Sequence, residues 1–252
     1  MKILFTICGR AGSKGIKNKN IRSFLDKPLP FYTLSALDIL LEKNRMNIEC
    51  DVVINSDSDE LLYMMKNNPF MRVDVIKRDS NLAGGSVGKI EVITDCLVKM
   101  EKQKNCQYDM VVDLDITSPL RTVNDIESVI EKQSRTKADV TTTITEARRN
   151  PYFNQLMQGN CGYKKVINSM YTARQQAPTV YDMNASIYAY KPEFLKSKKS
   201  LFDGYMECVE MYDTGILDLD HENDFELMEV VAKYLFDKKE DFRKIYTNIR
   251  EM

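Results

Sequence analysis

Short apolar runs alternate with helical patterns along the first 145 residues of this chain. Aliphatic and β-branched residues gather in five runs, which we predict to be strands: 3–8, 51–56, 72–77, 110–114 and 138–145. Helical spacing of apolar residues predicts helices at 29–41, 59–66, 90–100 and around 126–131. Strands that alternate with helices are typical of a parallel sheet with crossover helices. We therefore predict an α/β fold with a Rossmann-like, mixed but mostly parallel sheet and helices on both faces.

This alternation stops near Glu146. Residues 148–176 contain Gly159 and Gly162 and several aromatics, but no long helical pattern. Strand-like alternation returns at 183–190, a strong helical pattern covers 225–236, and a charged helix over 238–250 is expected to close the chain on the surface. We predict one domain over 1–252, with about 146–181 as an insertion.

Composition excludes several classes of protein. The 252 residues hold 36 basic and 37 acidic side chains, so no general affinity for nucleic acid or membrane surfaces is expected. The first strand begins at Ile3 and no apolar run has the length of a membrane span, so we expect a cytoplasmic protein without a signal peptide. Six scattered cysteines and a single histidine, His221, argue against zinc and favour free thiols.

A cationic loop follows the first strand. Gly9 and Gly12 allow a tight turn with exposed backbone N–H groups, and no acidic residue lies between residues 9 and 20. Four cations lie there: Arg10, Lys14, Lys17 and Lys19. Such a loop suits the phosphates of a nucleotide.

The order of residues in this loop differs from the P-loop pattern G-x-x-x-x-G-K-[ST]. Ser13 precedes Lys14, no Ser or Thr follows that lysine, and the next helical pattern begins only near Pro30. The alternative is a solvated basic loop with no ligand.

Two D-x-D pairs supply a second chemical pattern. Asp113 and Asp115 end the strand at 110–114, and Asp218 and Asp220 precede the helical pattern near Glu222. Residues i and i+2 of a strand project to one face, so each pair can present two carboxylates to a hard cation such as Mg²⁺. The alternative for either pair is a surface or helix-cap role.

Several motifs in order carry a family resemblance. They are Arg10-x-x-Ser13-Lys14-Gly15 with Lys19-Asn20, Lys27-Pro28-Leu29, Val53 to Asp57, Thr117 to Arg121, Arg174-Gln175-Gln176, Asn184 to Tyr188, and Asp218-Leu219-Asp220. Together they resemble the acylneuraminate cytidylyltransferases, the CMP-sialic acid or CMP-nonulosonate synthetases, over residues 3 to 228. The resemblance implies a sheet of the nucleotide-diphospho-sugar transferase type.

The resemblance also implies roles for single residues. CTP would be bound by Arg10, Gly12, Ser13, Lys14, Lys19, Asn20 and Arg78. The sugar acid would be bound by Asp115, Arg174, Asn184 and Tyr188, and the magnesium ion by Asp218 and Asp220. Catalysis would fall to Arg10, Lys14 and Asp220.

Two departures from the family pattern concern the site. His221 stands where the family often has Thr, and Leu114-Asp115-Ile116 replaces its usual L-Q-P. The charge of Asp115 would repel a sugar carboxylate unless a metal, Lys or Arg offsets it. Asp115 is therefore expected to bind metal or read a sugar hydroxyl, which favours a legionaminate- or pseudaminate-type acid.

The expected function is CTP-dependent activation of a nine-carbon α-keto sugar acid, with release of pyrophosphate and with Mg²⁺ as cofactor. We expect a homodimer in which about 146–181 reach across the two-fold axis, because the segment is long and aromatic and the family looks dimeric. The alternatives are a CTP-dependent octulosonate or other sugar nucleotidyltransferase, a D-x-D glycosyltransferase, and a nucleotide-sensing regulator.

Overall fold

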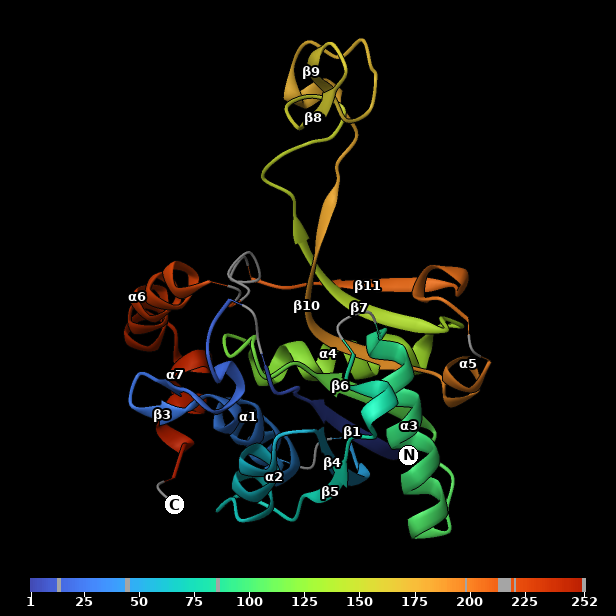
Figure 1. Ribbon diagram of the computed structural model, residues 1–252, viewed down its shortest axis with the longest axis vertical. Coiled ribbons are helices and arrows are strands. Elements are labelled where there is room, and N and C mark those ends of the chain that lie inside the picture. Colours follow the sequence, from blue (N-terminus) through green and yellow to red (C-terminus); the bar gives the residue numbers. More distant parts are fainter. Residues whose placement is uncertain are drawn as a thin grey trace.

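A seven-stranded sheet, in the order β11-β7-β10-β6-β1-β4-β5, forms the centre of the molecule (Figure 1). The computed structural model describes residues 1–12, 15–43, 46–84, 87–197, 199–212, 219 and 221–250. The strands of the sheet are β1 (Lys2–Cys8), β4 (Glu49–Ser56), β5 (Asp74–Lys77), β6 (Met110–Leu114), β7 (Val140–Glu146), β10 (Tyr181–Tyr190) and β11 (Met206–Glu210). Of these strands, β10 alone runs antiparallel to both of its neighbours, β6 and β7. The predicted mixed, mostly parallel α/β sheet is confirmed.

Helices cover both faces of this sheet (Figure 1). They are α1 (Leu29–Lys43), α2 (Asp59–Lys66), α3 (Lys89–Lys104), α4 (Val123–Arg135), α5 (Pro192–Lys196), α6 (Glu222–Lys238) and α7 (Glu240–Asn248). None of these helices is long and apolar enough to span a membrane. A short ribbon of β2 (Ser23–Phe24) and β3 (Lys27–Pro28) leads into α1.

Alternate residues of β1 supply the two hydrophobic cores, one on each face of the sheet. Ile3, Phe5 and Ile7 belong to the core that includes α1, whereas Leu4 belongs to the core that includes α3. Helix α1 is buried over most of its length because α4 and α7 also pack against it. An almost uniformly apolar helix is typical of such a position.

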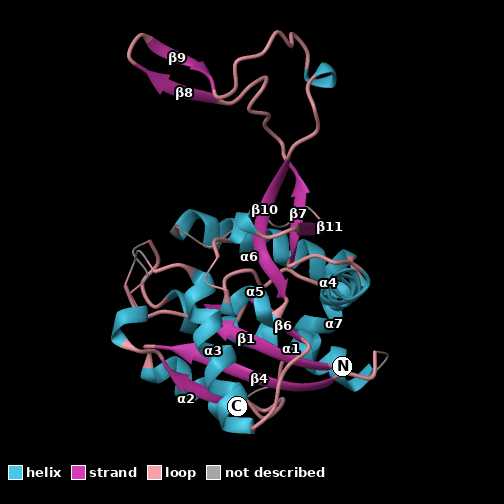
Figure 2. Cartoon of the chain, turned by 90° about the vertical axis from the view of Figure 1, so that its right-hand side faces the viewer, coloured by secondary structure: helices cyan, strands magenta, loops and turns pink. Residues whose placement is uncertain are grey.

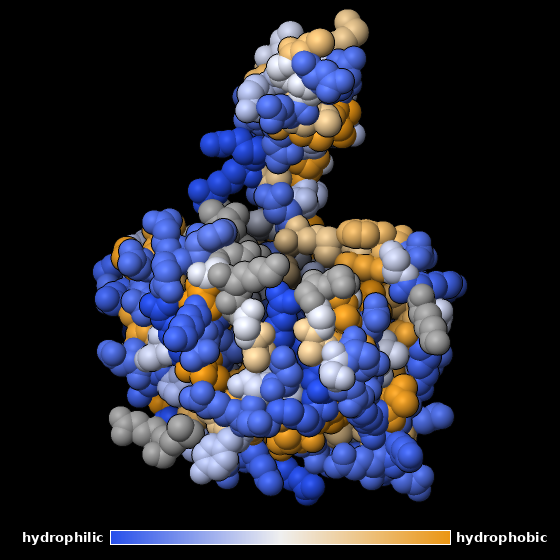
Figure 3. Space-filling view, viewed as in Figure 1, coloured by the Kyte–Doolittle hydropathy of each residue, from blue (hydrophilic) through white to orange (hydrophobic). Residues whose placement is uncertain are grey.

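Residues 147–180 leave the body of the molecule between β7 and β10 and project from it (Figures 1 and 2). Strands β7 and β10 pair from Glu146–Tyr181 inward, so the projection leaves and returns at neighbouring positions. It carries a hairpin of β8 (Leu156–Gly159) and β9 (Gly162–Lys165). The space-filling view shows it standing clear of the body (Figure 3). We call residues 147–180 the projecting segment.

Three elements at the carboxyl-terminal end of the chain differ from expectation. The sequence MECVE of β11 and the short helix α5 were not predicted, since neither has a full apolar period. The expected surface helix 238–250 is α7, and its placement on the surface is only partly correct: Phe242 and Ile245 are buried because the helix packs against α1 and α6.

Gly9 continues the backbone pairing of β1 and β4, and its N–H donates to the carbonyl of Asn55 at 3.1 Å. A Cβ atom at Gly9 would lie 2.7 Å from the Leu61 side chain and 2.9 Å from the Ile116 side chain. A larger residue at this position would therefore require the Leu61 or Ile116 side chain to shift.

We expect Gly9→Ala to lower the free energy of unfolding by about 1–3 kcal/mol, because a methyl group overpacks this contact. Urea unfolding followed by circular dichroism measures the change. Gly159→Ala is the matched control, since a Cβ there comes no closer than 3.6 Å to its neighbours. Equal stability of the two variants would show that the close approach at Gly9 has no energetic importance.

Candidate active site

The carboxyl ends of β1, β4 and β6 meet at one edge of the sheet, because both β4 and β6 pair with β1 in parallel. Arg10, Asn55 and Asp115 lie at or just beyond these ends. A cavity of about 290 Å³ opens there, and we call it the basic cavity. Its lining consists of Cys8, Arg10, Arg78, Leu82, Gly84, Val87, Lys89, Val92 and Asp115.

Side chains from two other segments hold the loop after β1. The carboxylate of Asp57 accepts from the backbone N–H of Ala11 at 2.6 Å, and the Asn20 amide donates to the carbonyl of Arg10 at 3.0 Å. Gly12 has φ 71°, a left-handed conformation that favours glycine. Lys19 and Asn20 belong to a 3₁₀ turn that closes this loop. The predicted phosphate-binding residues Ser13 and Lys14 lie outside the described residues.

Arg78 is a buried cation in the wall of the basic cavity. Its Nε donates to Oδ1 of Asn55 at 2.7 Å and its Nη2 donates to the Asn55 carbonyl at 3.0 Å. No described residue forms an ion pair with Arg78, which is only 8% exposed. Its remaining N–H groups therefore suit an acceptor in the cavity, such as a phosphate or a base carbonyl.

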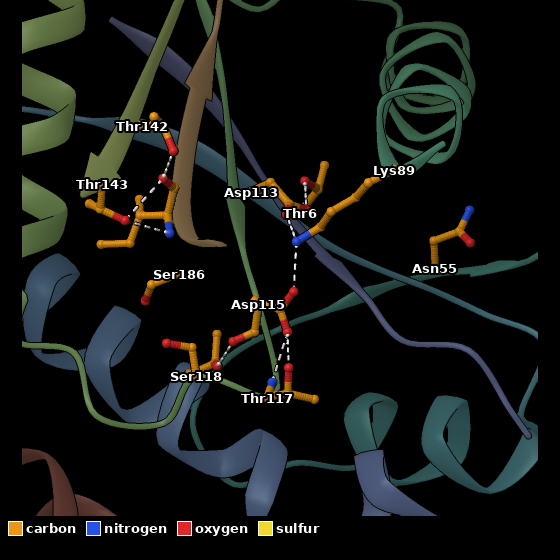
Figure 4. A network of polar contacts seen from close by, with 12 residues as sticks. Thr6, Asn55, Lys89, Asp113, Asp115, Thr117, Ser118, Thr142, Thr143 and Ser186 are labelled. Carbon is orange, nitrogen blue, oxygen red and sulfur yellow. Dashed lines mark hydrogen bonds and ion pairs between the residues drawn. The ribbon is translucent and has the colours of Figure 1, made fainter. Parts of the chain in front are cut away.

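A lysine lies between the carboxylates of the first D-x-D pair (Figure 4). The Nζ atom of Lys89, the first residue of α3, is 2.8 Å from a carboxylate oxygen of Asp113 and 2.8 Å from one of Asp115. The other Asp113 oxygen accepts from the Thr6 hydroxyl at 2.8 Å. The predicted projection of Asp113 and Asp115 to one face is thus observed.

The charges of this group stabilise each other. Burial lowers the pKa of Lys89, but Asp113 and Asp115 outweigh burial and hold that pKa well above its usual value. Burial likewise raises the pKa of Asp115, but Lys89 and two hydrogen bonds from Thr117 overcome it and hold that pKa well below its usual range. Lys89 and Asp115 are therefore both charged at neutral pH.

Arg121 holds the backbone of the turn that contains Asp115. It is 1% exposed and donates to the backbone carbonyls of Ser118 and Asp115. Burial lowers the pKa of Arg121 to about 10, which leaves the guanidinium charged. Arg121 therefore braces the turn after β6 and does not reach the cavity.

A second cavity, of about 790 Å³, lies beside the first. Its lining consists of Gly88, Lys89, Ile90, Glu91, Thr94, Tyr188, Tyr190, Leu195, Lys199, Ser200 and Leu201. The rings of Tyr188 and Tyr190 are stacked with centroids 5.9 Å apart, and we call this space the aromatic cavity. Among the described residues, Lys89 alone lines both cavities.

Two predicted sugar-binding residues lie outside these cavities in the single chain. Arg174 is on the projecting segment, where it contacts Glu146 and the carbonyl of Ala147. Asn184 is buried; its side chain accepts from the Thr143 hydroxyl and approaches the sulfur of Met211 at 3.4 Å. The structure therefore brings Asp115 and Tyr188 to the cavities, but not Arg174 and Asn184.

The second acidic pair, Asp218 and Asp220, lies outside the described residues. His221 caps α6: its backbone N–H donates to Asp224 at 2.8 Å and its ring nitrogen lies 3.2 Å from the same carboxylate. The described residues contain no group of three or more His, Cys, Asp or Glu side chains that could hold a metal ion.

Sequence reasoning did not single out Lys89, which the structure places in the walls of both cavities. A cation in the first turn of a helix is unfavourable, since the helix dipole is positive there. A lysine at that position therefore needs carboxylates nearby, and this signal was present in the sequence.

The sequence model of the cytidylyltransferases matches residues 4–242 of this chain. The chain belongs to this family. It is therefore a nucleotidyltransferase, as its motifs predicted, and the suspected family is confirmed.

Two relatives match almost the full length of this chain. Post-translational flagellin modification protein B of Campylobacter coli is 35% identical, and the match covers 92% of this chain and 95% of that protein. CMP-N,N'-diacetyllegionaminic acid synthase of Campylobacter jejuni is 32% identical, with coverage of 90% and 94%.

Among solved structures, CMP:2-keto-3-deoxy-manno-octonic acid synthetase complexed with CTP is similar to this cytidylyltransferase with a TM-score of 0.64. The match has 15% identity and covers 93% of this chain and 99% of that one. It supports the fold.

The low pKa of Asp115 predicts how stability depends on pH. The unfolded carboxyl has a pKa of about 3.9, so the contribution of Asp115 to stability is full above that pH and is lost as the pH falls toward the lower folded pKa. We expect the stability difference between the wild type and Asp115→Asn to shrink between pH 4 and pH 2.5, by up to about 1.4 kcal/mol per pH unit. Urea unfolding across this range measures it, and a difference that stays constant would contradict the ion pair.

Proposed function

We propose that this cytidylyltransferase transfers CMP from CTP to a nonulosonic acid, a nine-carbon α-keto sugar acid, with release of pyrophosphate. The observation that carries the proposal is the contact of the two cavities at Lys89: one is basic, the other is lined by tyrosines, and a reaction of two substrates needs both. The names of the relatives support a legionaminate-type acid.

CTP occupies the basic cavity in this proposal. Arg10, Gly12, Ser13, Lys14 and Lys19 bind the phosphates through the loop after β1. The apolar wall of Leu82, Val87 and Val92 and the guanidinium of Arg78 suit a nucleobase, and Asn20 contacts the base or holds the loop against it.

The sugar acid occupies the aromatic cavity. Tyr188 forms one wall, and Asp115 lies at the neighbouring edge, where it accepts a hydrogen bond from a sugar hydroxyl. Lys89 offsets the negative charge of Asp115, so a substrate with a carboxylate is not repelled.

The chemistry is an in-line displacement at the α-phosphorus. The anomeric hydroxyl oxygen forms a bond to that phosphorus, the bond to the bridging oxygen of pyrophosphate breaks, and the hydroxyl proton is lost to water. Arg10 and Lys14 stabilise the charge on the phosphoryl oxygens, and the Asn20 amide holds the backbone carbonyl of Arg10.

A divalent cation, which we propose to be Mg²⁺, would neutralise phosphate charge when bound. Its ligands would be Asp218 and Asp220, with Asp220 acting in catalysis, since carboxylate oxygens suit this ion. In the described structure the carboxylates of Asp113 and Asp115 already bind the ammonium of Lys89, which favours the second pair for the metal.

We further propose that the enzyme is a cytoplasmic homodimer, in which the projecting segment of each chain covers the site of the other. This segment exposes Tyr163, Leu156 and Met170, which are 73%, 61% and 97% accessible, and such apolar surface is typical of an interface. Arg174, half exposed and distant from its own cavities, would then bind the sugar carboxylate in the partner's site.

Purified protein with CTP, Mg²⁺ and each of a panel of sugar acids tests the function. We expect rapid pyrophosphate release with a legionaminate-type acid, slower release with pseudaminate and N-acetylneuraminate, and very little with octulosonate. Addition of EDTA is expected to abolish release. Preference for octulosonate would overturn the choice of substrate, and turnover unaffected by EDTA would overturn the metal.

Mixing two variants, each expected to be inactive alone, tests the shared site. Subunit exchange between Arg174→Ala and Lys14→Ala chains should restore activity, because one of the two sites in each heterodimer then has Lys14 and the partner's Arg174. Because one of its two sites is intact, each heterodimer is expected to recover up to half of the activity of a wild-type dimer. No recovery despite exchange, shown by mass spectrometry of the mixed dimer, would mean that each chain builds its own site.

A further inference from the structure

We propose that Lys89 is a catalytic residue, whose ammonium donates a hydrogen bond to a nonbridging oxygen of the α-phosphate where the two substrates meet. This inference rests on the proposed function and adds to it a residue that neither the motifs nor the relatives assign. It also gives the pair of Asp113 and Asp115 a role other than metal binding.

The position of Lys89 is the first argument. Bond formation between two substrates happens where their binding spaces meet, and Lys89 is the one described residue in the walls of both cavities. Its side chain is 33% exposed, so a substrate can reach the ammonium.

The geometry of the ammonium is the second argument. A lysine ammonium has three N–H donors, and one of them donates to Asp115 at 2.8 Å. The contact with Asp113 is an ion pair of 2.8 Å without hydrogen-bond geometry, so N–H donors remain for a substrate. The ring of Tyr188, whose centroid lies 5.5 Å from Nζ, borders the same space.

The local electrostatics are the third argument. Lys89 begins α3, where the helix dipole opposes a positive charge, and a side chain only needed for solubility would avoid this position. Two carboxylates, one of them fully buried, hold the ammonium there. Because its pKa is raised, Lys89 stays protonated and acts as a fixed donor, not as a base.

Lys89 therefore stabilises negative charge and does not transfer a proton. As the anomeric oxygen bonds to the α-phosphorus and the bond to pyrophosphate breaks, negative charge grows on the phosphoryl oxygens, and a donor already oriented by Asp113 and Asp115 stabilises it. The same ammonium keeps the two substrates from being repelled by the two carboxylates.

Three variants separate a catalytic role from simple charge balance. Lys89→Met removes the donor but leaves two carboxylates without their cation, so it changes the charge of the group as well. The double variant Lys89→Met with Asp113→Asn removes one cation and one carboxylate, so it restores the original net charge. Asp113 is chosen because it is fully buried and lines neither cavity. Lys104→Met is the matched control: Lys104 lies at the other end of α3 and also contacts two carboxylates, those of Asp51 and Asp74.

We expect Lys89→Met to lower kcat by about 100-fold, a loss typical of removing one donor to transition-state charge. The double variant should stay within about three-fold of Lys89→Met, and Lys104→Met should keep the wild-type kcat. Thermal melting and calorimetric titration with CTP show whether each variant folds and binds nucleotide.

Recovery of kcat in the double variant to within a few-fold of the wild type would overturn the proposal, because charge balance alone would then explain Lys89. An equal loss in Lys104→Met would overturn it as well, since the effect would then be structural. The wild type, assayed in parallel, tests the proposed function itself: failure of its turnover with every acid rejects that function, whereas a normal wild type with a normal Lys89→Met rejects only the role of Lys89.

Discussion

The parallel pairing of β1 with β4 on one side and β6 on the other determines where the candidate site residues at the ends of these three strands lie. Parallel strands end at the same edge of a sheet, so Arg10 after β1, Asn55 in β4 and Asp115 after β6 come together although they are far apart in the sequence. Gly9 favours this arrangement, because a larger residue would require the Leu61 or Ile116 side chain to shift.

Positive charge at this edge is held in place by different partners. Arg78 is oriented by a neutral amide and a carbonyl of Asn55, so its charge is not cancelled. Lys89 is held by two carboxylates, and Arg121 by backbone carbonyls beneath the turn. Cations fixed by neighbours need little reorganisation when an anion binds, which is the condition for strong electrostatic stabilisation.

Much of the fold follows from the sequence. Helix α2 and strand β6 have the predicted limits, because each has a clear apolar period and a clear boundary. Strand β11 does not, since it lies at the edge of the sheet with half-exposed residues, and its place depends on pairing with β7. Tertiary contacts decide such a segment, and periodicity alone does not show them.

The candidate site was predicted less completely than the fold, because it too depends on tertiary contacts. Motifs pointed to Arg10, Arg78, Asp115 and Tyr188, and all four line the two cavities. Lys89 was not singled out: its position at the start of a helix indicates carboxylates nearby, but only the fold shows that these are Asp113 and Asp115. The roles of Arg174 and Asn184 are not evident within one chain, since neither is among the described residues that line the basic or the aromatic cavity.

The projecting segment leaves the sheet from β7 and returns through β10, and these two strands are hydrogen-bonded neighbours. The ends of the segment are therefore held at a fixed, short separation by the sheet, whatever the segment contains. Such an arrangement works as a cassette: residues can be inserted, deleted or exchanged between 147 and 180 with little cost to the closure of the loop. Evolution can thus alter the surface of the projecting segment while the sheet, and the cavities at its edge, stay the same.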